Sequence, residues 1–288
     1  MDLAAIVVIE VLNAIAGLVL ISIGLAIIFG MMRVINIAHG EFLMMGAYAV
    51  LISVKNGINI WIAMLVIAPI VVGIIGVIIE RCLIRFLYGR MIDTLLATWG
   101  LSLFIIGAVT MIFGNTVEGV SSPMGSLPIG TYTVSWYTLF MILLAVLLLI
   151  AVYLVMKRTR LGLIARGTMQ KPEMAAALGI APSTVYMVTF GVGAGLAGLA
   201  GGVLAPVAGV VPNMGAAYIA KAFITVVVGG EAIVVGTSVA SGLLGTISQV
   251  MTFLTTPVWG DAAMLFVAVI LLRILPQGIT GRFFRRSI

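Results

Sequence analysis

The chain has 288 residues, of which 63% are apolar and 8% are charged, and its mean hydropathy is +1.32. A soluble domain carries roughly 25% charged residues, so this composition excludes a water-soluble globular protein. The net charge of +6 does not indicate nucleic-acid binding, because the basic residues gather in short clusters between apolar stretches, as they do in the loops of membrane proteins.

Apolar segments follow one another along the whole chain. About 20 helical residues cross the ~30 Å hydrocarbon core of a bilayer. We expect spans near residues 8–32, 42–54, 60–79, 94–114, 135–156, 184–206, 216–229, 232–254 and 261–276. The segments 42–54 and 216–229 are short, and we expect one or both to be broken or re-entrant. The predicted fold is an all-α, polytopic membrane helix bundle with eight or nine membrane segments, forming a single domain over residues 1–288.

Three basic clusters determine the predicted orientation. They are Arg81, Arg85 and Arg90; Lys157, Arg158, Arg160, Arg166 and Lys171; and Arg282, Arg285 and Arg286. An even number of spans separates each pair of clusters, so all three fit on the cytoplasmic side. The N-terminus then lies outside, the C-terminus lies in the cytoplasm, and residues 114–135 form an outer loop rich in Gly, Ser and Pro.

The densest group of polar residues lies between the first two spans, at Arg33, Asn36, His39 and Glu41. A charge inside lipid costs about 2.5–3.5 kcal/mol on the insertion scale, so such residues are functional candidates. Asn36 and His39 would share a helical face, and Arg33 would pair with Glu41 if the segment folds back. Three interpretations remain open: the lining of a translocation path, a proton relay, and a cap that satisfies a broken helix internally.

Two later segments add candidates for the lining of such a path. Thr98, Trp99 and Ser102 lie within one span, where Trp99 either walls a pore or packs as a buried aromatic residue. Asn213 and Tyr218 mark the start of a short span.

Two further features have alternative interpretations. Lys221, in the same short span as Tyr218, is either an anchor that extends to the interface or a cavity residue, and we favour the anchor. Two small-xxx-small patterns in the 184–206 span indicate close helix packing, either within the chain or at a subunit interface. They comprise Gly191, Gly195, Gly198 and Gly202.

No catalytic residue or metal site is expected. One His and one Cys do not make a metal-ligand set, and the sequence has neither a G-x-x-x-x-G-K-[ST] phosphate-binding loop nor a G-x-S-x-G nucleophile motif. The chain is therefore predicted not to be an enzyme and to bind no cofactor of its own.

Residues 157–183 form a predicted cytoplasmic loop that contains a short helix. Pro172 suits a first helical position, Glu173 the first turn, and Gly179 the end. Two helical turns are not stable alone in water, so this helix needs a partner surface on its own bundle or on another protein.

Several motifs resemble the permease family of ABC importers for branched-chain amino acids and urea. The segment 29–48 is similar to the first signature of that family, 189–201 to its glycine-rich helix, and 276–278 to its C-terminal ending. The run from Glu173 to Gly179 resembles the coupling loop of ABC-importer permeases. The resemblance covers about the whole chain.

The resemblance implies an assembly in a bacterial inner membrane. It comprises a second related permease, two cytoplasmic ATPase subunits that bind the ATP, and an extracytoplasmic solute-binding protein. This chain would form half of the translocation path. Candidate path residues are Asn36, His39, Glu41, Thr98, Trp99, Ser102, Asn213 and Tyr218, and candidate ATPase-coupling residues are Glu173, Ala175, Ala176 and Gly179.

Two substrate branches remain open. Three segments look more like the branch for urea and short amides: 93–103, 190–193 and 211–219. Two others, 221–223 and 278–282, fit the branched-chain amino-acid branch as well as they fit the urea branch. We favour urea. Alternatives from other classes are a stand-alone secondary transporter or channel, which would require ion-coordinating residues at mid-membrane, and a membrane enzyme acting on lipids.

Overall fold

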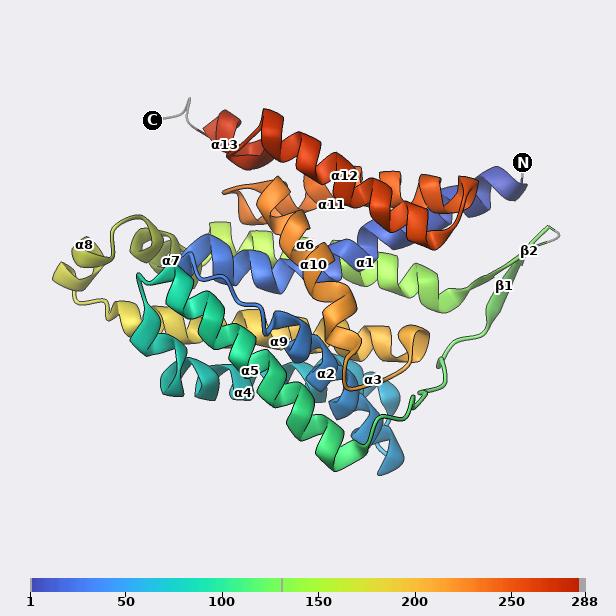
Figure 1. Cartoon of the computed structure of the whole chain (residues 1–288), viewed down its shortest axis with the longest axis horizontal. Coiled ribbons are helices and arrows are strands. Elements are labelled where there is room, and N and C mark those ends of the chain that lie inside the picture. Colours follow the sequence, from blue (N-terminus) through green and yellow to red (C-terminus); the bar gives the residue numbers. More distant parts are fainter. Residues whose placement is uncertain (1, 131, 285–288) are drawn as a thin grey trace. The chain divides into compact units, whose positions relative to one another are not determined.

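The computed structural model describes residues 2–130 and 132–284. In this part of the chain, seven helical segments are long and apolar enough to cross a membrane. They are α1 (Asp2–Met32), the run of α3 (Ile60–Ile62), a π-helical turn (Ala63–Ile67) and α4 (Ala68–Cys82), then α5 (Met91–Phe113), α6 (Trp136–Arg158), α9 (Pro182–Ala208), α11 (Ile233–Leu254) and α12 (Pro257–Ile274) (Figure 1). Each predicted long span is confirmed to within a few residues.

Shorter elements connect these spans. They are α2 (His39–Lys55), a 3₁₀ turn (Ile84–Leu87), α7 (Arg160–Gln170), α8 (Pro172–Ala177), α10 (Met214–Gly229) and α13 (Gly278–Phe284). The predicted loop at 114–135 contains an antiparallel hairpin of β1 (Ser126–Ile129) and β2 (Tyr132–Ser135), with Ser126 opposite Ser135. The content of Gly, Ser and Pro in this segment predicts only a loop, so the hairpin is an addition to the predicted all-α fold.

The contacts divide the chain into two compact units. Unit 1 comprises residues 1–22, 122–150 and 221–288, and unit 2 comprises 23–121 and 151–220. The boundaries between the units fall inside α1, α6 and α10.

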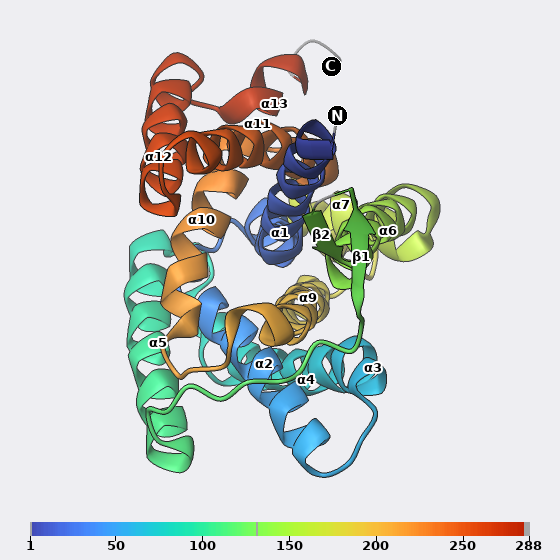
Figure 2. The same cartoon turned by 90° about the vertical axis from the view of Figure 1, so that its right-hand side faces the viewer.

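In unit 2 the central element is α9, which packs against α2 and α4 (Figure 2). A Cβ at Gly46 of α2 would overlap the Gly198 carbonyl oxygen, and one at Gly201 would overlap the Leu43 carbonyl oxygen. Glycine therefore lets the two backbones touch directly.

The opposite side of α9 packs against α4 in the same way. A Cβ at Gly195 would lie 2.9 Å from the Pro69 carbonyl oxygen, and one at Gly198 would lie 2.8 Å from that of Ala68. The small-residue patterns of α9 thus serve packing within the chain, which decides between the two interpretations of the sequence.

Unit 1 is built on α11, which packs against α12 and α13. Gly260 of α12 sits against Ser248 and Thr252 of α11. The Thr280 hydroxyl of α13 donates to the Gly229 carbonyl oxygen at 2.5 Å and accepts from the Ala232 N–H at 3.2 Å. These two hydrogen bonds fix the turn between α10 and α11.

Of the predicted third basic cluster, Arg285 and Arg286 lie outside the described residues.

The glycine contacts generate a stability prediction. Gly201→Ala should destabilise the protein by about 1–3 kcal/mol, the usual cost of overpacking, because the new methyl group meets the Leu43 backbone. Gly100→Ala in α5 is the control, since no atom lies within 4 Å of its added Cβ. Thermal unfolding of both variants in detergent measures the difference, and equal midpoints would contradict the α2–α9 contact.

Candidate functional site

The first feature of the site is a break in the backbone between α1 and α2. Helix α1 ends at Met32, and Arg33 adopts a left-handed conformation with φ +51°, which reverses the chain direction at a helix end. Helical hydrogen bonding resumes when the Ala38 carbonyl oxygen accepts from the N–H groups of Glu41 and Phe42. The break therefore precedes α2. The short segments 42–54 and 216–229, one or both of which were expected to be broken or re-entrant, are themselves continuous helix in α2 and α10.

Helix α5 supplies polar partners to this break. The Thr98 hydroxyl oxygen accepts from the Ile37 N–H at 3.2 Å and lies 3.3 Å from the Ile35 carbonyl oxygen. One helical turn further, the Ser102 hydroxyl donates to the Glu41 carboxylate. Thr98 and Ser102 therefore face the break, as a non-helical segment inside a membrane protein requires.

A second break lies between α9 and α10 and meets the first. Gly209 has φ +70° and ends α9, and helix α10 begins at Met214. A Cβ at Gly40 would lie 2.5 Å from the Gly215 carbonyl oxygen. The starts of the two short helices α2 and α10 are therefore in direct contact, although they are far apart in sequence.

The polar side chains at the first break are buried, with Asn36 1%, His39 0%, Glu41 2%, Thr98 0% and Ser102 6% exposed. Both polar atoms of the Asn36 amide and Glu41 Oε2 have no hydrogen-bond partner within the described residues. A buried polar atom left unpaired costs about 1–3 kcal/mol. These atoms are therefore available to a solute or to bound water.

The expected Arg33–Glu41 pair does not form, because the Glu41 side chain is buried whereas Arg33 is exposed. The interpretation of a cap in which these charges pair with each other is therefore wrong. The Glu41 carboxylate instead accepts the hydrogen bond from the Ser102 hydroxyl.

The remaining path candidates do not join this buried group. Trp99 is 53% exposed, so its interpretation as a buried aromatic residue is wrong. Asn213 is exposed and Tyr218 is half-buried. Lys221 Nζ lies 2.7 Å from Asp261 Oδ1 of α12, so the favoured role of a free interfacial anchor is replaced by an ion pair.

The predicted short helix is confirmed as α8, and Gly179 follows it with φ +84°. Ala175 is buried against the neighbouring helices, while Glu173 and Ala176 are exposed. Met174 and Leu178 are 57% and 76% exposed. The helix therefore presents apolar side chains that this chain does not cover.

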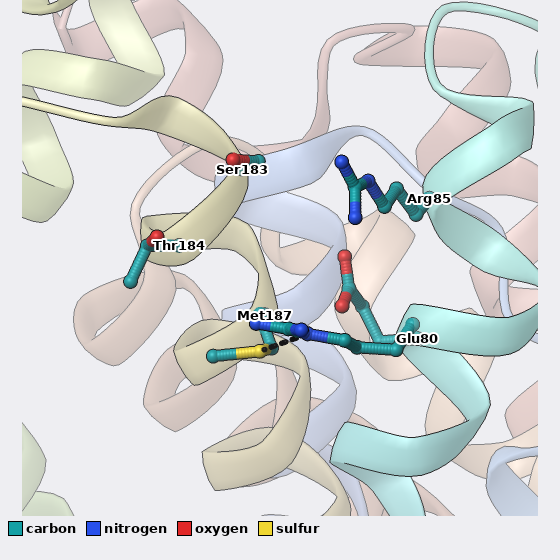
Figure 3. A pocket seen from close by; sticks show the side chains of 6 residues that line it. Glu80, Arg85, Ser183, Thr184 and Met187 are labelled. Atoms are coloured by element: carbon teal, nitrogen blue, oxygen red, sulfur yellow. Dashed lines mark hydrogen bonds between the residues drawn. The ribbon is translucent and has the colours of Figure 1, made fainter.

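A small pocket that the sequence did not reveal lies where the start of α9, the helix that follows α8, meets the end of α4. It is lined by Glu80, Arg81, Arg85, Ser183, Thr184 and Met187. Figure 3 shows the Glu80 and Arg85 side chains pointing toward one another, and Arg81 Nε donates to Met187 Sδ at 3.2 Å.

Glu80 is the buried member of this pocket, at 1% exposed, and its carboxylate accepts from the Tyr88 hydroxyl. Burial, together with the hydrogen bond to Glu80, raises the pKa of Tyr88, so the phenol remains a donor at physiological pH. Arg81 and Arg85 belong to the first basic cluster of the sequence, whereas Glu80, in the last turn of α4, was not among the predicted site residues.

The comparisons identify relatives along nearly the whole chain. The family described as "Branched-chain amino acid transport system / permease component" matches residues 7–275. The chain is 29% identical over 287 residues to the high-affinity branched-chain amino acid transport system permease protein BraD of Pseudomonas aeruginosa, and 27% identical over 279 residues to LivH of Salmonella typhimurium, with 91% of each chain covered in both cases. It is 26% identical over 280 residues to a probable branched-chain amino acid transport permease protein LivH of Methanocaldococcus jannaschii, covering 92% of this chain and 88% of that protein. No solved structure gives a significant match.

The contact between α5 and the first break generates a prediction. Thr98→Val should lower the free energy of unfolding by about 1–3 kcal/mol, because the Ile37 N–H loses its buried acceptor. Thr98→Ser should retain most of the stability. Thr110→Val in the same helix is the control, since the Thr110 hydroxyl bonds only the carbonyl oxygen of Ile106 one turn earlier. Thermal unfolding would contradict the assignment if Thr98→Val and Thr110→Val behaved alike.

Proposed function

This chain belongs to the family of permease components of branched-chain amino acid transport systems, and from that membership we propose that it forms half of the translocation path of an ATP-driven importer of branched-chain amino acids. It is the multi-pass permease component and not the ATPase subunit. The observation that carries the proposal is the family match over residues 7–275, joined by relatives of nearly equal length.

The proposed substrate differs from the urea that the sequence motifs favour. The relatives BraD and LivH are named for branched-chain amino acid transport, which supports the amino-acid branch. The geometry supports it as well, because the N-terminal ends of α2 and α10 meet at Gly40 and Gly215. Helix N-termini carry partial positive charge and favour a carboxylate, which an amino acid has and urea lacks.

We propose that the buried group at the first break contacts the passing solute. The Asn36 amide and Glu41 Oε2 have unused hydrogen-bonding capacity, and His39, Thr98 and Ser102 complete the polar surface around them. Asn213, Tyr218 and Trp99 are partly or fully exposed in one chain. They would contact the solute if the path runs between two permeases.

The proposed assembly adds a second permease, two ATPases and an extracytoplasmic binding protein in a bacterial inner membrane. The N-terminus lies outside, and residues 157–183 form the cytoplasmic coupling loop with Glu173, Ala175, Ala176 and Gly179 at its centre. Met174 of α8 and Leu178, directly after it, support an ATPase contact, because a stand-alone channel would leave them uncovered. Movement of α8 would pass to α9 and switch the path between outward-facing and inward-facing states.

Together with the seven long spans, the short helices α2 and α10 make nine proposed membrane segments. Helices α2 and α10 would start within the protein rather than at a membrane–water interface. The proposal follows from the non-helical segments that precede both helices. Non-helical backbone is tolerated at membrane depth where protein or a water-filled cavity surrounds it.

Substrate identity is tested by uptake. Cells that lack the chain should lose uptake of radiolabelled leucine and regain it when the chain is restored, with urea uptake unchanged. Restored uptake of urea without leucine would overturn the amino-acid assignment.

The coupling helix is tested by substitution. Leu178→Asp and Glu173→Arg should abolish leucine uptake while the protein remains inserted, because both side chains are exposed and lie on the proposed ATPase contact. Gly179→Pro should act likewise, since proline cannot adopt φ +84°. Leu178→Met is the matched control and should retain uptake. Normal uptake by Leu178→Asp and Glu173→Arg would show that α8 does not couple.

A further inference from the structure

The ion pair between Lys221 and Asp261 joins the short apolar helix α10 to the candidate membrane span that contains α12. Lys221 is in the middle of α10 and Asp261 is in the second turn of α12, and the Nζ and Oδ1 atoms are 2.7 Å apart. We propose that this pair is a binding site for the two charged ends of a zwitterionic amino acid. The proposal rests on the proposed function and adds a site to it.

The position of the pair is unusual among the ion pairs of the described residues. Lys55 is the last residue of α2 and pairs with Glu118 in a loop, and Arg90 and Asp93 flank the start of α5. Those pairs lie at helix ends, where water reaches them. Lys221 is the only charged residue of α10, so it lies inside an otherwise uncharged segment.

The exposure of the pair indicates what it faces. The side chains of Lys221 and Asp261 are 32% and 45% exposed. Charged groups in membrane segments face the protein interior or a water-filled cavity, because exposure to lipid is costly. The open side of this pair therefore faces a hydrated surface, which in a permease is the solute path.

The chemistry of the pair matches that of an amino acid. The α-carboxylate of the solute would bind the Lys221 ammonium, and the α-ammonium of the solute would bind the Asp261 carboxylate. Each of the four charges then has a partner, so the zwitterion leaves water without an unpaired charge. Urea is uncharged and does not replace either member of the pair, so the site selects for amino acids.

The alternative role is a brace that joins α10 to α12. Two double variants separate the roles. Lys221→Met with Asp261→Asn removes both charges, and Lys221→Asp with Asp261→Lys reverses them while keeping an ion pair. An ion pair that only braces the two helices holds them equally well when its charges are reversed. An L-amino acid would bind the reversed pair with its carboxylate and ammonium groups exchanged, so its side chain would point in a different direction.

The measurement is the maximal uptake rate of L-leucine in cells, corrected for the amount of each variant in the membrane. We expect both double variants to lose uptake roughly ten- to hundredfold, the usual effect of removing a hydrogen bond to a charged group. The control is Lys55→Met with Glu118→Gln, which removes an ion pair at a helix end and should stay within about twofold of the unaltered chain.

Three outcomes would overturn the site. The first is full uptake by the neutral variant, and the second is recovery of uptake by the reversed pair. The third is loss of membrane insertion by both double variants, which would show that the pair is a brace. The unaltered chain separates these results from failure of the proposed function. If it imports leucine while either double variant does so equally well, only the site fails. If it imports urea and no leucine, the proposed function fails first.

Discussion

The direct contact of α9 with α2 and α4 determines the arrangement of unit 2. Helices in lipid gain little from burying apolar side chains, so their association depends on close van der Waals packing. Gly46, Gly198 and Gly201 bring the α2 and α9 backbones together. The two backbone breaks lie at the start of α2 and at the end of α9.

Each break exposes backbone groups that lipid does not satisfy. At the first break, Thr98 provides an acceptor for the Ile37 N–H. At the second, the backbone of Glu118 in the loop after α5 exchanges two hydrogen bonds with Val210, at 3.0 and 2.8 Å. The Asn36 side chain has no hydrogen-bond partner within the described residues, so its amide group keeps unused hydrogen-bonding capacity at the first break.

The proposed zwitterionic substrate suits the charged groups of each unit taken by itself. In unit 2, helix N-termini meet at Gly40 and Gly215, and a buried carboxylate lies beside them at Glu41. In unit 1, an open ion pair joins Lys221 to Asp261. A neutral solute such as urea needs hydrogen-bonding groups but none of these charges. In the proposed importer, the exposed apolar side chains at α8 are the surface for a partner outside the membrane.

The sequence by itself determined the membrane spans, the short helix α8 and the candidates Asn36, Glu41, Thr98 and Ser102, because hydropathy and helix-end signals are local. The tertiary structure decided which candidates meet: Thr98 contacts a segment 61 residues away, and Trp99, its neighbour in sequence, does not join the buried group. It also assigned the α9 glycines to packing within the chain and gave Lys221 its partner. The physical reason is that partners from different helices depend on how closely the backbones approach, and no local pattern records that distance.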